Sequence, residues 1–183
     1  MKGTAGIVTP SGVKGLSFAD EAASANALVP KLKAEGADAI VLLIHQGGKT
    51  PQFTTGSGCD GIYGDILPIL PRLDPAITTI VSGHTHWAYV CRGTPQVGAG
   101  RLLTSAGKYG YFATDLRLRF DPVSHRLVGQ DAQNIVVGNG DRGEDTSEQA
   151  LVDRYASAVA PIASRIVGRL TATATKSTED GES

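Results

Sequence analysis

Two apolar segments of strand length, each followed by histidine, constrain the fold of this 183-residue chain most strongly. The segment 38–44 leads into His45, and the segment 76–82 leads into Gly83-His84-Thr85-His86. An apolar run without alternation is typical of a central strand that is covered on both faces. Because α/β proteins carry their functional side chains in loops beyond the carboxyl ends of strands, we expect these three histidines to lie there.

The three histidines indicate a metal site. In a regular strand, residues two apart project to the same face, so the rings of His84 and His86 could reach one region of space. Neutral imidazole is a common metal ligand, and a histidine set without a thiolate cluster suits zinc, manganese, iron, cobalt or nickel better than calcium. The alternative is a structural role, in which each histidine is hydrogen-bonded or half-exposed. His125 lies in a predicted hairpin turn and is assigned no chemical role.

Composition narrows the classes of partner. The chain has 17 basic and 18 acidic residues, without a basic run, which argues against nucleic acid and favours a small-molecule ligand. With 41% hydrophobic residues, we expect a soluble globular chain of about one domain. No apolar run approaches the roughly 20 residues that span a bilayer, and the amino terminus lacks the apolar core of a signal peptide.

The remaining pattern predicts alternating strands and helices, then hairpins, then one long helix. A helix is expected to start at the capping box Ser17-Phe18-Ala19-Asp20 and to end at Gly36. Pro68 and Pro71 should distort a helix over 64–73 or limit it to short turns. Strands are predicted over 6–9, 101–106, 111–120, 126–128 and 133–137, and a long helix over 146–169 with a kink at Pro161.

The histidine motif also carries a resemblance to a known family. The segment Val81-Ser82-Gly83-His84-Thr85-His86, followed by Leu103-Thr104-Ser105-Ala106-Gly107-Lys108-Tyr109-Gly110 and by Val159-Ala160-Pro161-Ile162-Ala163, resembles the metallophosphoesterase superfamily, in particular bacterial 5′-nucleotidases and bifunctional metallophosphatases. The resemblance implies an α/β fold, a partial metallophosphoesterase-like sandwich with a mixed β-sheet flanked by helices. Residues 1–145 would form the carboxy-terminal half of a catalytic domain, 146–170 an interdomain linker helix, and 171–183 a disordered or truncated tail.

The resemblance implies a chemistry as well. In this family two divalent metal ions, drawn from zinc, manganese, iron and cobalt, activate a water that hydrolyses the phosphomonoester of a nucleotide or a similar small molecule. His45 and His84 would bind the second metal ion, and His86 the first. Relatives of this type are secreted, cell-wall or periplasmic proteins.

The chain departs from the family pattern before His45. The family's Asp-x-His, Gly-Asp and Asn-His motifs, which supply further ligands, the bridging aspartate and the catalytic histidine, do not occur there. We therefore expect a fragment, a misassigned start or a degenerate copy with little or no activity alone. An uncovered apolar sheet face should favour self-association or pairing with an amino-terminal half. A noncatalytic metal-binding module and a structural fragment remain the alternatives.

The two cysteines flank the presumed metal site. Cys59 lies in the loop after His45, and Cys91 lies five residues after His86. A disulfide is the favoured interpretation and would fit an exported protein, while free buried thiols and metal ligation are the alternatives. Asp60 and Asp65 are assigned to a loop and a helix cap and left out of the site. Lys108, Tyr109 and Tyr111 could face substrate, but a turn and cover for the sheet explain them more simply.

Overall fold

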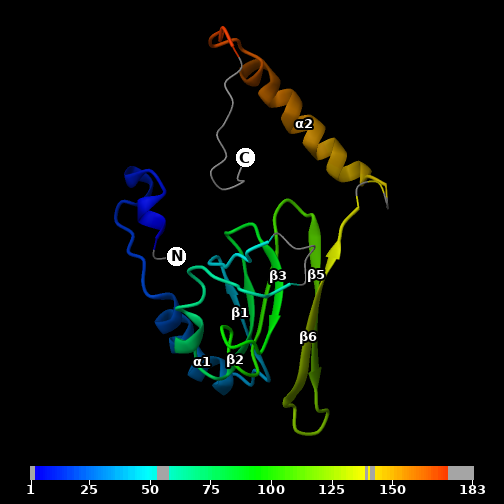
Figure 1. Ribbon diagram of the computed structural model, residues 1–183. Helices are drawn as coiled ribbons and strands as arrows, with labels where there is room; N and C mark the ends of the chain where they lie inside the picture. Colours follow the sequence, from blue (N-terminus) through cyan, green and yellow to red (C-terminus); the bar gives the residue numbers. More distant parts are fainter. Residues whose placement is uncertain (1–2, 53–57, 139, 141–142, 173–183) are drawn as a thin grey trace. The chain divides into compact units, whose positions relative to one another are not determined.

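A computed structural model describes residues 3–52, 58–138, 140 and 143–172 of the chain. The chain divides into two compact units, Met1–Gly138 and Asn139–Ser183. The first unit contains both sheets and the three motif histidines, and the second contains the long helix (Figure 1). Most of the tail predicted over 171–183 lies outside the described residues.

The first unit is built on a four-stranded mixed sheet. Its strands, in spatial order, are β1 (Ile40–Ile44), β2 (Ile77–Ser82), β4 (Leu102–Ala106) and β3 (Ala88–Arg92). Strands β1, β2 and β4 run parallel, and β3 runs antiparallel to β4. Ile44 pairs with Ser82 at the last position of both strands, so the segments that follow β1 and β2 leave the same edge of the sheet. The expected mixed α/β architecture is confirmed.

Helix α1 (Glu21–Ala34) packs on one face of this sheet. Its amino-terminal cap is Asp20, whose carboxylate accepts a hydrogen bond from the backbone N–H of Ala23, so the capping box predicted from Ser17 is wrong by three residues. Ala22 and Val29 point into the main core. That core is completed by apolar residues of the loops and strands, among them Ile62, Ile66, Leu70, Leu73, Ile77, Ile80, Tyr89 and Leu103.

A long antiparallel hairpin forms the second sheet. Strands β5 (Phe112–Phe120) and β6 (Leu127–Val136) pair along their whole length, so β6 is one continuous strand and not the two short strands predicted. Two polar side chains of β6 bind the first sheet. Gln130 accepts from the Thr79 hydroxyl at 2.6 Å, and the Asn134 amide donates to the carbonyl of Ser105 at 2.8 Å.

Two further predictions fail for physical reasons. Residues 6–9 form no strand, because they offer no strand-length apolar run to a neighbour. Two short 3-10 helices, Thr4–Gly6 and Pro10–Val13, lie in this region. Strand β3, absent from the prediction, follows the histidine motif and is buried except for its last residue.

The segment 64–73 is limited to turns and a 3-10 helix, Leu70–Arg72, as its prolines predicted.

Strand β1 is an edge strand and not the central strand predicted. Ile40 is buried, but Val41 and Leu43 are 37% and 76% exposed. Within the described residues, β2 is the only strand that pairs with β1. One face and one edge of this strand are therefore open.

Helix α2 (Thr146–Ala163) belongs to the second unit. The Asp145 carboxylate caps it by accepting from the N–H groups of Ser147 and Glu148. The helix ends six residues earlier than predicted, two residues after Pro161, which removes a backbone donor from its last turn. Among the described residues, no helix is long and apolar enough to cross a membrane.

Candidate functional site

His45 and His84 meet at the carboxyl edge of the parallel strands. His45 follows β1 directly, and His84 lies two residues past the end of β2. Their ring centroids are 5.2 Å apart, with the ring planes inclined by 62°. Both side chains are exposed to solvent. The parallel register of β1 and β2 thus brings together two imidazoles that are 39 positions apart in the sequence.

The ring of His86 contacts a different neighbour from the rings of His45 and His84. Because β2 ends at Ser82, the alternation rule for strands does not govern His84 and His86. Both residues adopt left-handed backbone conformations, with φ of 71° and 62°. The ring of His86 packs 6.0 Å from that of Tyr109. Left-handed geometry is costly for residues with a Cβ and is concentrated at functional sites.

The loops that carry the histidines are packed against each other through glycine. A Cβ atom on Gly47 would lie 2.1 Å from the carbonyl oxygen of Gly83, which is far inside contact distance. The Thr85 hydroxyl, between the two motif histidines, donates to the carbonyl of Gly48 at 2.6 Å. The backbone next to His45 therefore touches the backbone next to His84.

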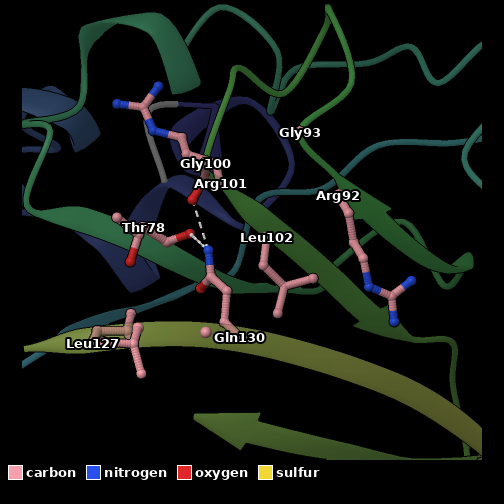
Figure 2. A pocket seen from close by; sticks show the side chains of 10 residues that line it. Thr78, Arg92, Gly93, Gly100, Arg101, Leu102, Leu127 and Gln130 are labelled. Atoms are coloured by element: carbon pink, nitrogen blue, oxygen red, sulfur yellow. Dashed lines mark hydrogen bonds between the residues drawn. The ribbon is translucent and has the colours of Figure 1, made fainter. Parts of the chain in front are cut away.

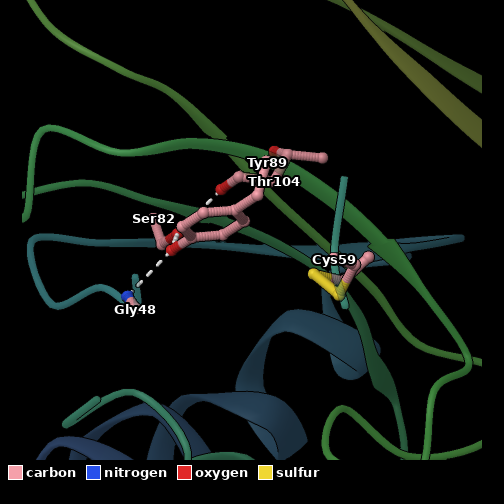
Figure 3. Close-up of a disulfide and its surroundings, with 6 residues drawn as sticks. Gly48, Cys59, Ser82, Tyr89 and Thr104 are labelled. Atoms are coloured by element: carbon pink, nitrogen blue, oxygen red, sulfur yellow. Dashed lines mark hydrogen bonds between the residues drawn. A yellow bond between two sulfur atoms is a disulfide. The ribbon is translucent and has the colours of Figure 1, made fainter. Parts of the chain in front are cut away.

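A buried network of hydrogen bonds lies behind these loops (Figure 3). The N–H of Gly48 donates to the Tyr89 hydroxyl oxygen at 3.0 Å, and that hydroxyl lies 2.6 Å from the hydroxyl of Ser82. Ser82 donates its proton to the carbonyl of Thr104 at 2.8 Å, so Tyr89 must donate to Ser82. Burial raises the pKa of Tyr89, which keeps its proton available for this bond. This network fixes the loop after β1 and the end of β2 to β3 and β4.

A disulfide joins Cys59 to Cys91, the pairing favoured from the sequence (Figure 3). It ties the loop after β1 to β3, across a sequence separation of 32 residues. Cys91 is fully buried, and Cys59 packs against the main core. Neither sulfur is a thiolate, so metal ligation by the cysteines does not occur in this structure.

A cavity with a volume of about 520 Å³ opens beside His84. Its polar lining includes Gln46 and three acidic residues, Asp20, Glu21 and Asp65. Arg72 also lines it and forms an ion pair with Asp20. Asp65, which the sequence assigned to a loop or helix cap and not to the site, lines the same cavity as His84.

The described geometry can be compared with known proteins. No known family profile matches the chain. It is similar in structure to the calcineurin-like phosphoesterase YfkN from Bacillus subtilis, with a TM-score of 0.60 and 16% identity over 85% of this chain and 48% of that one. A Staphylococcus aureus protein to which 5′-nucleotidase activity is provisionally assigned gives a TM-score of 0.56 and 18% identity, over 81% of this chain and 28% of that one. The chain has a metallophosphoesterase-like fold.

One curated relative is similar in sequence. Endonuclease YhcR from Bacillus subtilis is 27% identical over 164 residues, which span 90% of this chain and 12% of that protein. The chain thus spans about an eighth of this relative and half or less of the two solved structures. The resemblance predicted from the histidine motif is confirmed as a shared fold.

Metallophosphoesterases generally use divalent metal ions, so a complete site requires enough side chains that can ligate a metal. Among the described residues, no three His, Cys, Asp or Glu side chains are grouped so that they could hold a metal ion. His45 and His84 offer two nearby imidazoles, whereas a protein metal site typically uses three or four ligands. The described residues therefore fit part of a metal site and not a whole one.

The phosphoesterase-like unit has a second cavity, of about 460 Å³, between the first sheet and the hairpin (Figure 2). It has two arginines in its lining, but both guanidinium groups are already bound. Arg101 donates to the carbonyls of Leu70 and Leu73, and Arg92 pairs with Asp131. Gln130 donates to the carbonyl of Gly100, so this cavity is held by internal hydrogen bonds.

Proposed function

We propose that this chain supplies the histidine half of a 5′-nucleotidase-type phosphoesterase site, which hydrolyses nucleotide phosphomonoesters with a metal-activated water. The observation that carries the proposal is the His45–His84 pair at the carboxyl edge of β1 and β2, in a fold shared with phosphoesterases. His45 and His84 would each donate one imidazole nitrogen to a divalent ion. Such an ion, when bound, neutralises phosphate oxygens and lowers the pKa of a bound water.

His86 is proposed as a ligand of a first metal ion on family resemblance, and its ring lies 6.0 Å from that of Tyr109. The described residues hold no complete ligand set. We therefore propose that the chain alone has little or no phosphatase activity. The missing ligands would come from a further segment of polypeptide.

The surface of β1 supports pairing with such a segment. Leu43 and Val41 expose apolar side chains, and the edge of β1 that has no partner strand among the described residues presents backbone donors and acceptors. An open apolar edge of this kind favours strand addition by another chain. Self-association and pairing with an amino-terminal half are the two proposed outcomes. The substrate is proposed to be a small nucleotide or another phosphomonoester, not nucleic acid.

The disulfide supports a location outside the cytoplasm. Disulfides persist mainly in secreted, cell-wall and periplasmic proteins, because the cytosol keeps thiols reduced. We propose one of these oxidising locations for the protein, in agreement with the Cys59–Cys91 bond.

A metal titration tests the proposed function. We expect the 183-residue chain to bind Mn²⁺ or Zn²⁺ weakly, with at least a tenfold loss of affinity in H84N and in H45N, measured by titration calorimetry. H125N is the matched control, since His125 lies on the β5–β6 hairpin turn. Hydrolysis of AMP by the chain should be negligible.

The metal titration and the AMP hydrolysis assay each have an outcome that would contradict the proposed function. Equal metal binding by H84N and the unmodified chain would exclude the histidine pair as a ligand set. Robust AMP turnover would contradict the incompleteness of the site. Metal binding without hydrolysis, even after an amino-terminal phosphoesterase half is added, would favour the noncatalytic metal-binding module, a function that the incomplete ligand set also supports.

A further inference from the structure

Three aromatic side chains contact one another in series, starting from the motif residue His86. His86 is 6.0 Å from Tyr109, and Tyr109 is 6.2 Å from Tyr111, with the two tyrosine rings at 85°. We call His86, Tyr109 and Tyr111 the aromatic platform. It begins two residues after His84, in the same loop between β2 and β3 as that proposed ligand.

The platform faces solvent. Tyr109 is 72% exposed and Tyr111 is 53% exposed. A turn and cover for the sheet are the simpler expectation from the sequence, but rings this exposed cover little of the sheet. A large aromatic ring left in water forgoes the burial that ordinarily stabilises it, and exposed aromatic clusters are typical of binding surfaces.

The backbone around Tyr109 holds its ring in this exposed position. Tyr109 has a φ of 55°, in the left-handed region that a tyrosine rarely adopts. Gly107 and Gly110, both with a φ of 72°, surround it in the same turn. Strained residues of this kind cluster at ligand-binding positions, because the surrounding structure must maintain them at a cost.

A cation accompanies the rings. The Lys108 ammonium lies 4.9 Å from the centre of the Tyr109 ring. Stacking faces combined with positive charge are the recognition chemistry of nucleobases linked to phosphate, since each base has a π-face and each phosphate is anionic. Lysine can move from the ring to a phosphate because its stem is flexible.

We propose that the aromatic platform binds the face of a nucleobase, which stacks on Tyr109 beside the histidine pair. This deepens the proposed function, on which it rests for the position of the phosphate near His84. The base belongs to a free nucleotide, the small-molecule substrate of the proposed function.

Nucleoside binding separates this proposal from the metal site. We expect adenosine and AMP to bind the 183-residue chain, detected through the fluorescence of Trp87, which is the only tryptophan and adjoins His86. Ribose 5-phosphate should bind at least tenfold more weakly than AMP. Because adenosine has no phosphate, H84N should weaken AMP and leave adenosine unchanged. Adenosine binding thus survives even if the proposed phosphoesterase site fails.

Ring-removing variants identify the platform. In Y109N the ring is lost, while asparagine tolerates the left-handed backbone. We expect about 5- to 100-fold weaker adenosine binding in Y109N, and a loss in Y111A, with Y109F close to the unmodified chain. The matched control is Y155A, because Tyr155 is also exposed and has a cation, Arg154, 5.7 Å from its ring, but lies on α2.

An oligonucleotide of six deoxyadenosines tests whether the ligand is a free nucleotide. Binding equal to or weaker than that of AMP is expected, and tighter binding would contradict a free nucleotide as the ligand. The proposal is overturned if Y109N and Y111A, with unchanged circular dichroism spectra, bind adenosine as the unmodified chain does. It is also overturned if ribose 5-phosphate binds as tightly as AMP.

Discussion

At the scale of single residues, small groups around the histidines decide how closely the two site loops approach. Gly47 allows backbone contact with Gly83, and the Thr85 hydroxyl satisfies the carbonyl of Gly48. Sequence patterns identified His45 and His84 because histidines after apolar runs are conspicuous. They did not identify Gly47 as a packing position, because the contact joins residues 36 positions apart.

Substituting Gly47 should therefore be costly. In G47A the new Cβ would lie 2.1 Å from a backbone oxygen, so the loops must separate. We expect a loss of about 1–3 kcal/mol in the free energy of unfolding, measured by urea denaturation. G12A is the control, since a Cβ at Gly12 meets no atom within 4 Å and should change stability by about 0.5 kcal/mol or less. Equal stability of the two variants would contradict the close packing of the loops.

At the scale of elements, the disulfide fastens the loop after β1 to β3. The sequence predicted that the two cysteines pair, but it did not predict β3. This short strand, Ala88–Arg92, is buried except for its last residue and follows the histidine motif without a strong turn signal. The prediction of β5 was accurate because its residues alternate, whereas β6 was divided in two because polar residues interrupt its pattern.

Removal of the Cys59–Cys91 bond should destabilise the first unit. A closed loop of this length restricts the unfolded chain, so we expect C59A/C91A to unfold with about 2–4 kcal/mol less free energy than the oxidised protein. Reductant should lower the stability of the unmodified chain and have no effect on C59A/C91A. Insensitivity of both proteins to reductant would show that the bond does not form in solution.

At the scale of the whole molecule, each of the two units exposes apolar surface. Among the described residues, one edge of β1 has no partner strand and one of its faces exposes apolar side chains. Helix α2 exposes an apolar stripe that includes Leu151, Val152, Tyr155 and Val159. The sequence predicted the apolar run of β1 correctly but placed it at the sheet centre. Which side of a strand lacks a neighbour depends on the strand order, and a local pattern does not encode it.

The exposed face of β1 should drive association. We expect the unmodified chain to show a mass that rises with concentration in analytical ultracentrifugation, and L43K to reduce this association, because a charge opposes burial of the strand face. V123K is the control, since Val123 is 87% exposed on the hairpin turn and is not part of the β1 strand face. A monomeric unmodified chain at all concentrations would contradict the proposed pairing surface.

The sequence by itself determined the α/β class, most strand positions, the cysteine pair and the histidines that follow strands. These features depend on local periodicity and residue chemistry, which the chain order carries directly. Only the tertiary structure decided that His45 meets His84 while His86 turns to Tyr109, and that β1 is an edge. The parallel register of β1 with β2 brings the first pair together. His84 and His86 lie past the end of β2 and have left-handed backbones, so the alternation of a strand does not set the directions of their rings. Both depend on contacts between distant residues, which periodicity does not contain.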